Sequence, residues 1–316
     1  MNVLALSGTL SFLALASLLT TCGQPGEATA TEGSPSFLST PPVSVTRRTP
    51  PVQAAWSYNI GGSDLLNSGS TPTGTVVSLD LYNVTPATIT RLRAAGKYIV
   101  CYYSAGSSER YRSDTQSLRL LDLALNLGDV LKGDGGVWVG ERWLDIRSFS
   151  TTTGGPGATI RSVMTARLSL AREKGCNAVE PDNVDAWSND VSRHAPAGTS
   201  ANAISAQDQL AYNRWTAETA HALDLFVLLK NDLEQIPALL PSYDGALNEE
   251  CFDFEGDCAQ LVPFRDAGKA VYVVEYHAPN FVTASRQEQA ARWHLNVVLT
   301  DLNITRLDPL ARFGTW

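Results

Sequence analysis

Residues 225–231 read LFVLLKN and residues 270–276 read AVYVVEY, and each of these apolar runs ends in polar side chains. Neither run alternates apolar with polar residues, which is typical of strands that are covered on both faces. Similar short runs bring the predicted strands to eight, the others being 76–80, 98–103, 136–143, 178–182, 245–249 and 295–300. Helical spacing of apolar residues predicts helices between them, at 86–95, 158–174, 206–223 and 284–294.

Strands that alternate with helices along a chain predict parallel β-α-β units. Eight such units in about 260 residues match the size of a (β/α)8 or TIM barrel, which is the α/β fold that we expect. An open, doubly wound sheet is the alternative, because periodicity does not show whether a sheet closes. A ninth short run, at 55–60, is expected to plug or flank the barrel.

The N-terminal part has a different composition from the rest of the chain. Residues 9–19 read TLSFLALASLL, an apolar run with the length of a signal-peptide core and too short to span a bilayer. The LTTCG sequence around Cys22 resembles a bacterial lipobox, so we expect residues 1–21 to be a signal peptide and Cys22 to be lipidated. The alternative is an ordinary cleaved signal with an incidental cysteine. Residues 22–52 are rich in Pro, Ser and Thr and are expected to form a flexible linker before a folded domain at 53–316.

Charge and motifs exclude several classes of protein. The chain has 24 basic and 32 acidic residues, and its net charge of -8 argues against a nucleic-acid partner and mildly favours a cationic substrate. It has no P-loop, no GxGxxG after a strand, no HExxH and no Gly-x-Ser-x-Gly elbow. The histidines lack ligand spacing to a second His or Cys. We therefore expect no cofactor and no metal. The histidines are His194, His221, His277 and His294.

Acidic residues stand at the ends of several predicted strands. Asp80 ends the first, Glu180 and Asp182 lie at the end of the fourth, Glu249 ends the sixth and Glu275 lies at the end of the seventh. In a TIM barrel the C-terminal ends of the strands meet at one mouth, where the active site lies. Glycoside hydrolysis needs two carboxyl groups flanking the scissile bond. Asp182 and Glu249 are the best candidates for that pair.

Other roles are open to these acids. Asp182 or Asp185 could cap the helix that follows, since a carboxylate accepts orphan N–H groups at a helix N-terminus. Glu250 competes with Glu249, because adjacent residues of a strand point in different directions.

Short segments between 56 and 276 resemble glycoside hydrolase family 114, the endo-α-1,4-polygalactosaminidases. The matching segments are 77–81 (VSLDL), 101–107 (CYYSAGS), Glu109 with Arg110, 141–147 (ERWLDIR), 179–185 (VEPDNVD), 229–232 (LKND), 248–251 (NEEC) and 274–276 (VEY). The resemblance implies a TIM barrel, hydrolysis of α-1,4-linked galactosamine polymers, and catalytic roles for Asp182 and Glu249. By analogy with related barrels, Asp182 is the nucleophile and Glu249 the acid/base. This predicts retention, with carboxyls about 5–5.5 Å apart rather than the roughly 6.5–9.5 Å of inverting enzymes.

Further polar and aromatic residues near the strand ends are expected to bind the substrate. Acids at the mouth would attract the ammonium group of galactosamine, and aromatic faces would contact sugar rings. For Tyr103 and Trp143 core packing is the alternative, and for Asp80 and Glu275 a buried ion pair with Lys230. The expected substrate-binding residues are Asp80, Tyr102, Trp143, Asp145, Glu180, Asn183, Asp185, Lys230, Asn231, Glu275 and Tyr276.

The leading hypothesis is therefore an exported endo-glycosidase, secreted or tethered by its lipid, whose partner is an amino-sugar polysaccharide. We expect a monomer that meets a membrane only through the N-terminal anchor. One alternative is a carbohydrate-binding barrel without turnover. The other is a barrel hydrolase or transferase that acts on a different sugar.

Four cysteines remain in the expected folded domain. Cys251 and Cys258 are seven residues apart, and a disulfide between them would pin the loop that follows Glu249. Cys101 lies within a predicted strand and Cys176 just before one, and both are expected to be buried thiols.

Overall fold

The computed structural model describes residues 48–117, 125–132, 136–147, 149, 155–254 and 256–314. Contacts divide the chain into Met1–Val45 and Thr46–Trp316, and the fold described here belongs to the second unit. The predicted signal peptide, Cys22 and most of the predicted linker lie outside the described residues. Among the helices of the described part, none combines the length and the apolar character needed to cross a bilayer.

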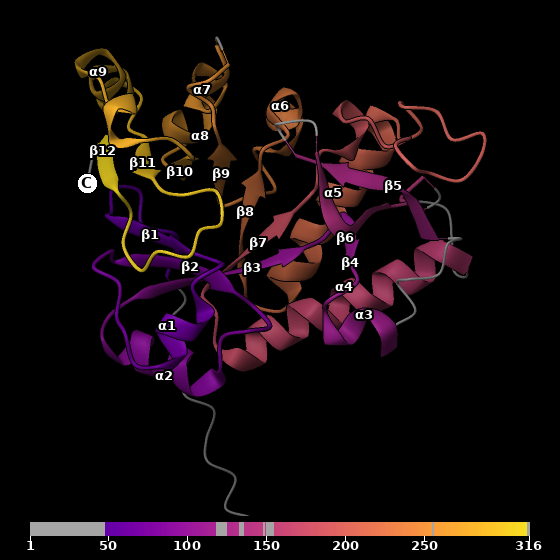
Figure 1. Cartoon of the computed structure of the whole chain (residues 1–316), viewed down its shortest axis with the longest axis horizontal. Helices are drawn as coiled ribbons and strands as arrows, with labels where there is room; N and C mark the ends of the chain where they lie inside the picture. The colour runs from indigo at the N-terminus through magenta and orange to yellow at the C-terminus, as the bar shows by residue number, and fades with distance from the viewer. Residues whose placement is uncertain are drawn as a thin grey trace, which may run out of the picture. The chain divides into compact units, whose positions relative to one another are not determined.

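A parallel sheet that curls into a barrel forms the centre of the domain (Figure 1). Its parallel strands, in spatial order, are β1 (Trp56–Asn59), β2 (Val76–Asp80), β3 (Tyr98–Ser104), β7 (Ala178–Asp182), β8 (Phe226–Lys230), β9 (Gly245–Glu249), β10 (Ala270–Glu275) and β11 (Asn296–Leu299). An antiparallel strand, β12 (Ala311–Gly314), pairs with β11. The two ends of the parallel series meet, since Asn296 accepts the Ala54 N–H at 3.2 Å and the Trp56 indole at 2.9 Å. The predicted (β/α)8 barrel class is thus confirmed.

Helices cover the outside of this sheet, where α2, α5 and α8 pack against β3, β8 and β10. The α-helices are α1 (Ser63–Asn67), α2 (Pro86–Ala94), α3 (Ser113–Ser117), α4 (Gly155–Lys174), α5 (Ala206–Ala222), α6 (Ile236–Leu239), α7 (Asp257–Gln260), α8 (Val262–Asp266) and α9 (Ala284–Arg292). Short 3-10 turns lie at Ala186–Ser188, Leu233–Gln235 and Pro279–Phe281. Helix α5 begins with a capping box between Ser205 and Asp208, which satisfies its first N–H groups.

Two strand predictions are wrong. The run at 55–60 does not plug the barrel, because it supplies β1, the first barrel strand, whose four residues are all buried. The run at 136–143 is not a barrel strand. It forms β6 (Val137–Leu144) of a separate antiparallel sheet with β4 (Ser107–Glu109) and β5 (Asn126–Leu131). Only three of the eight residues of β6 are buried, and Trp138 and Val139 are exposed, so the apolar residues of this run do not form a strand that is covered on both faces.

Side chains alternate between the barrel interior and the layer beneath the helices. In β10, Tyr272 and Val274 pack in the interior cluster, whereas Val271 and Val273 pack in the outer cluster. This period of two is a property of strand geometry. It decides which polar residues at the strand ends face the mouth of the barrel.

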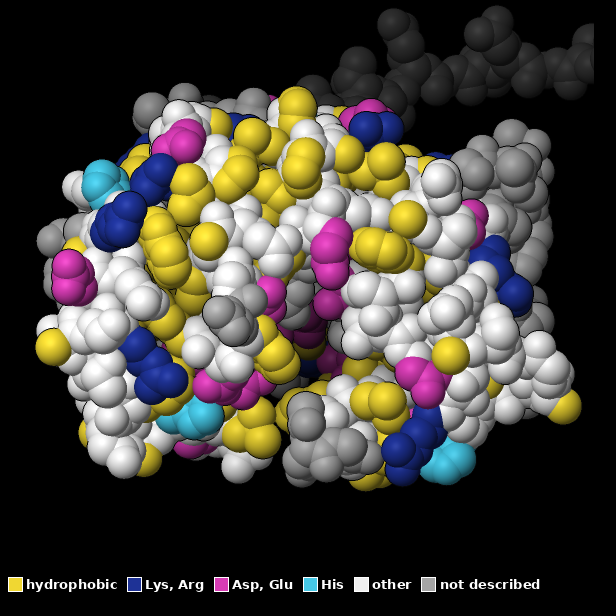
Figure 2. All heavy atoms as spheres, turned by 90° about the horizontal axis from the view of Figure 1, so that it is seen from above, with side chains coloured by type: hydrophobic (Ala, Val, Ile, Leu, Met, Phe, Trp, Pro, Cys, Tyr) yellow, Lys and Arg dark blue, Asp and Glu magenta, His cyan; other side chains and the backbone are white. Residues whose placement is uncertain are grey.

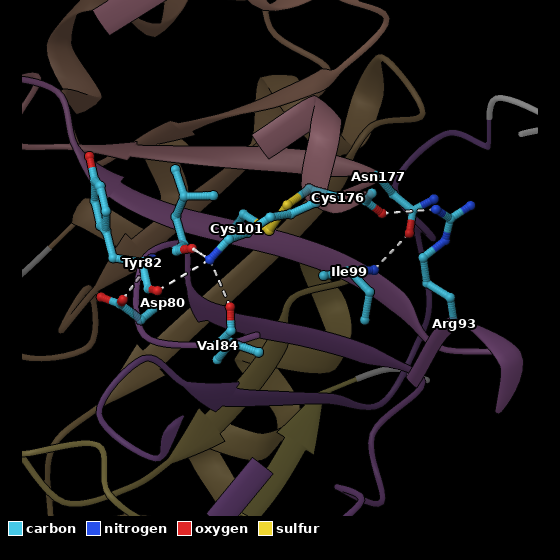
Figure 3. Close-up of a disulfide and its surroundings, with 11 residues drawn as sticks. Asp80, Tyr82, Val84, Arg93, Ile99, Cys101, Cys176 and Asn177 are labelled. Atoms are coloured by element: carbon cyan, nitrogen blue, oxygen red, sulfur yellow. Dashed lines mark hydrogen bonds between the residues drawn. A yellow bond between two sulfur atoms is a disulfide. The ribbon is translucent and has the colours of Figure 1, made fainter. Parts of the chain in front are cut away.

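The structure contains two disulfides. The predicted disulfide between Cys251 and Cys258 is present. The prediction of free thiols at Cys101 and Cys176 is wrong, because these two cysteines form a second disulfide, with their Cα atoms 6.0 Å apart (Figure 3). The parallel pairing of β3 with β7 brings them together, although they are 75 positions apart in the sequence. Beside the bridge, Asn177 accepts the Ile99 N–H at 2.9 Å.

The end of the predicted linker contacts the barrel. The Tyr272 hydroxyl donates to the Pro51 carbonyl at 2.7 Å, and the Asn296 amide donates to the Val52 carbonyl at 3.0 Å. Ordered packing therefore begins before residue 53, the predicted domain boundary.

Candidate active site

A cleft of about 630 Å³ opens at the C-terminal ends of the barrel strands. Figure 2 shows acidic side chains gathered in a central hollow of the molecular surface. The positions in phase with the barrel interior, at the ends of the strands, are Tyr58, Asp80, Tyr102, Glu180, Asp182, Lys230, Glu249 and Tyr276. Because side chains alternate between the two faces of each strand, these polar residues all point toward the interior of the barrel at its mouth.

Lys230 lies at the centre of this set. Its Nζ is 3.1 Å from Glu180 Oε1, 3.1 Å from Asp182 Oδ1 and 3.3 Å from Glu249 Oε2, and its side chain is 1% exposed. Burial lowers the pKa of Lys230, but the three carboxylates outweigh burial and raise that pKa well above its usual value. Lys230 is therefore a fixed cation that holds mutually repelling carboxylates together.

The shared lysine limits the separation of the two candidate catalytic groups. Asp182 Oδ1 and Glu249 Oε2 both contact Lys230 Nζ, so these two oxygens are at most about 6.4 Å apart, the sum of the two contact distances. Two side chains that are 67 positions apart in the sequence thus face one small space.

Neighbouring side chains orient both carboxylates. The Tyr102 hydroxyl donates to Asp182 Oδ2 at 3.1 Å, and the Tyr276 hydroxyl donates to Glu249 Oε1. Asn231 accepts the Glu249 N–H at 3.0 Å and donates to its Oε2 at 3.4 Å. Asp182 ends a strand and bonds to Tyr102 and Lys230, so its carboxylate is not used as a helix cap.

Glu249 and Glu250 take different positions. Glu249 contacts Lys230, whereas the backbone of Glu250 turns into the left-handed region with φ 59°. Asn183 and Asn231, which follow β7 and β8, have φ values of 61° and 49°. Asparagine adopts this conformation more readily than glutamate does, so Glu250 is the more strained of these three positions.

A second acidic network lines the cleft beside Asp182. Glu141, from β6, accepts the Asn183 amide at 2.9 Å and a hydroxyl of Ser107. Burial, with a contribution from the charge of Glu109, raises the pKa of Glu141 to about 8. The small sheet therefore supplies one wall of the cleft.

Comparison with known proteins shows to which family the chain belongs. Residues 39–308 match the glycoside-hydrolase family GH114. The chain belongs to this family. The matched region contains both Asp182 and Glu249, and family membership makes the protein a glycoside hydrolase.

Two solved structures are similar to the GH114 chain. The crystal structure of Aspergillus fumigatus Ega3 in complex with galactosamine shares 29% identity, with a TM-score of 0.65 over 82% of this chain and 96% of that one. The glycoside hydrolase domain of PelA from Pseudomonas aeruginosa shares 14% identity, with a TM-score of 0.51 over 80% and 96% of the two chains, and supports the fold alone. We found no significant match among curated proteins.

Most of the residues expected to bind substrate line the cleft of the GH114 enzyme or lie directly beneath it. Lys230 and Glu180 lie beneath, where Glu180 accepts the Tyr58 hydroxyl at 2.7 Å and burial raises its pKa to about 7. Trp143 is 3% exposed yet lies in the cleft wall. The predicted residues in the lining are Asp80, Tyr102, Trp143, Asp182, Asn183, Asp185, Asn231, Glu249 and Tyr276.

Two predicted residues lie elsewhere. Asp145 forms an ion pair with Arg147 at 2.6 Å in a separate small pocket, because it follows β6 and not a barrel strand. Glu275 is fully buried on the outer side of β10 and accepts the Phe252 N–H at 3.1 Å. The structure does not bring either side chain to the cleft.

The predicted alternative of an ion pair between Lys230 and Asp80 is wrong. Asp80 pairs instead with the buried Arg112 at 2.6 Å, and Arg112 also contacts Glu109 at 2.9 Å. Sequence reasoning missed Arg112, Glu141 and Tyr58 as site residues. For Tyr58 the available signal was its position within an apolar run of strand length.

Raised carboxyl pKa values predict an acid-stable enzyme. Burial raises the pKa of Glu141 to about 8 from a usual value of 4.5, and those of Glu180 and Asp185 to about 7. The unfolded chain loses these protons at lower pH than the folded one, so folding is favoured at low pH and this contribution is lost as pH rises from about 4.5 to 8. We expect urea unfolding to give a free energy at least about 2 kcal/mol higher at pH 5 than at pH 8.5.

The variant Glu141→Gln should flatten this dependence, because one proton-linked group is removed. Free energies of unfolding that stay level or rise across the same pH range in the wild-type protein would contradict the raised pKa values of these three carboxyl groups.

Proposed function

We propose that this GH114 enzyme is an endo-glycosidase that hydrolyses α-1,4-linked galactosamine polymers, with Asp182 as nucleophile and Glu249 as general acid/base. The observation that carries the proposal is the shared contact of both carboxylates with Lys230 at the mouth of the barrel. The similar Ega3 structure, which contains galactosamine, supports the choice of sugar.

Retention of anomeric configuration is the outcome that we propose, and two carboxylates that contact one lysine are compatible with it. Their nearest oxygens are at most about 6.4 Å apart, the sum of their distances to Lys230 Nζ. Inverting enzymes keep their carboxyls about 6.5–9.5 Å apart to admit a water molecule, whereas retaining enzymes hold them at about 5–5.5 Å. A retaining reaction passes through a covalent glycosyl-enzyme.

In the first step, Asp182 attacks the anomeric carbon while Glu249 gives its proton to the leaving glycosidic oxygen. The C–O bond breaks and an ester forms on Asp182. Water then attacks the same carbon, gives a proton to Glu249 and releases the Asp182 carboxylate. The Tyr102 hydroxyl donates to Asp182 at 3.1 Å and the Lys230 ammonium lies 3.1 Å from it, so these two groups orient Asp182 for attack.

The charge of the cleft suits a cationic glycan. The acids in its lining exceed its bases, and the chain as a whole has a net charge of -8. An ammonium group on each unacetylated sugar would be attracted to such a surface. The acidic residues in the lining are Asp80, Glu141, Asp182, Asp185, Glu249 and Glu250. Burial raises the pKa of Glu141 to about 8 and that of Asp185 to about 7, so the negative charge of the lining grows as the pH rises.

We also infer that the protein is exported. Two disulfides are typical of chains that fold in an oxidising compartment. The signal peptide at 1–21 and lipidation of Cys22 remain predictions from the sequence.

The substrate proposal is tested with defined polymers. We expect the purified enzyme to release new reducing ends, and oligosaccharides of mixed length, from partly deacetylated α-1,4-galactosaminan. A fully acetylated sample, a glucosamine polymer and a galacturonan of similar length are the matched controls. Equal release from the glucosamine polymer would refute the proposed sugar specificity, and products of one sugar unit only would refute endo cleavage.

A further inference from the structure

A second cluster of chemically reactive side chains lies on the rim of the cleft. Glu250, Asp253 and His277 each offer one ligand atom, and the three atoms lie within 4.8 Å of one another. His277 Nε2 is 2.6 Å from Asp253 Oδ2, and the two side chains are 37% and 31% exposed. Glu250 and Asp253 come from the loop after β9, and His277 from the segment after β10, so the cluster joins two neighbouring strand ends.

A buried carboxylate beneath the loop adds to this cluster. Glu275 is fully buried, and its Oε1 accepts the N–H of Phe252, the residue before Asp253. Its Oε2 is also buried and has no hydrogen-bond partner among the described residues. A buried carboxyl oxygen without a partner is uncommon in proteins, and the charges of Asp253 and Glu250 act on the same side chain.

Local structure holds the three candidate ligands in place. The His277 ring is stacked on Phe281, with ring centroids 4.3 Å apart and an interplanar angle of 2°. The Cys251–Cys258 disulfide closes the loop directly after Glu250. A site whose ligands are fixed before binding loses less conformational entropy when an ion arrives.

We propose that Glu250, Asp253 and His277 bind a divalent transition-metal ion of the Zn²⁺ type. One imidazole nitrogen and two carboxylate oxygens form a ligand set that Zn²⁺ accepts, with water completing a four-coordinate site. Ca²⁺ prefers oxygen ligands alone, so the imidazole selects against it. The ion joins the loop after β9 to the end of β10 and neutralises acids beside Glu249.

Titration calorimetry on the full chain, freed of metal by chelation and dialysis, tests the proposal with ZnCl₂ as the probe. We expect one tightly bound ion per chain. Because each variant removes a ligand, His277→Ala and Asp253→Asn should each weaken binding at least about tenfold. The matched control is His194→Ala, since His194 pairs with Asp129 at 2.8 Å in the same way but belongs to no such triad in the described part of the chain.

Two further readouts keep the result independent of catalysis and of folding. Excess Zn²⁺ should raise the unfolding midpoint of wild type and of His194→Ala but not of His277→Ala. Circular dichroism of the metal-free variants shows whether each variant is folded. If His277→Ala is not folded, Asp253→Asn takes its place in the comparison. Unchanged Zn²⁺ affinity in the folded variants, no binding by wild type, or equal binding of Ca²⁺ would overturn the proposal.

Discussion

The variant Asp182→Asn is expected to lower turnover on galactosaminan by roughly 10⁴-fold or more, because it removes the carboxylate that attacks the anomeric carbon. Asparagine has nearly the same shape and can still accept the Tyr102 hydroxyl, so the fold and the unfolding midpoint should change little. Reducing-end release at saturating substrate measures the effect. The loss should appear in kcat and not mainly in KM.

The matched control for this variant is Asp145→Asn. Asp145 is the other acid that the sequence places near the site, but it pairs with Arg147 in a separate small pocket. Its variant should keep turnover within about twofold, since surface substitutions of this kind have small effects. If Asp182→Asn kept a tenth of wild-type turnover or more, Asp182 would not be the nucleophile.

The second large effect is expected from Lys230→Met. Lys230 is 1% exposed and contacts the fully buried Glu180 and the partly exposed Asp182 and Glu249, so its loss leaves these acids without their shared cation. Removing one partner of a buried ion pair costs about 3–5 kcal/mol, and we expect a fall of that size in the free energy of unfolding. Urea denaturation measures it.

A double variant distinguishes this electrostatic role from a packing role. Glu180→Gln removes the most deeply buried carboxylate beside Lys230, so combining it with Lys230→Met should restore part of the lost free energy. The control is Lys132→Met, a lysine in the cleft wall that contacts the Trp138 ring. A strictly additive double variant, or a loss in Lys230→Met no greater than in Lys132→Met, would refute the charge-balancing role.

Much of the barrel could be predicted from local pattern. Continuous apolar runs mark strands such as β8 and β10, because both of their faces are covered. The rule that the mouth lies at the C-terminal strand ends then locates Asp182 and Glu249 near each other without any coordinates.

The pairing of elements is harder to predict, because it depends on contacts that are distant in sequence. Residues 136–143 look like a buried strand, yet β6 lies in a small antiparallel sheet. The prediction that Asp145 binds substrate at the mouth of the barrel depended on that strand, and the structure places Asp145 outside the cleft. The Cys101–Cys176 bridge follows from the neighbouring positions of β3 and β7, which strand order along the chain does not reveal.

Lys230 shows how side-chain direction completes the site. The sequence suggests it as a substrate ligand or as a partner of Asp80 or Glu275. The structure pairs it with acids of β7 and β9, the strands on either side of its own. Glu275 is out of phase with the barrel interior, so its carboxylate points to the outer layer. Register and phase together, and not charge alone, decide the ion pairs.

Trapping of the covalent intermediate tests the two-carboxylate account most directly. In the variant Glu249→Gln, an α-galactosaminyl fluoride can still react, because fluoride leaves without needing a proton, whereas release of the ester lacks its general base. Mass spectrometry of the digested protein should find one galactosaminyl group on the peptide that contains Asp182. A label on Asp185 or Glu250, or steady turnover with no label, would contradict the account.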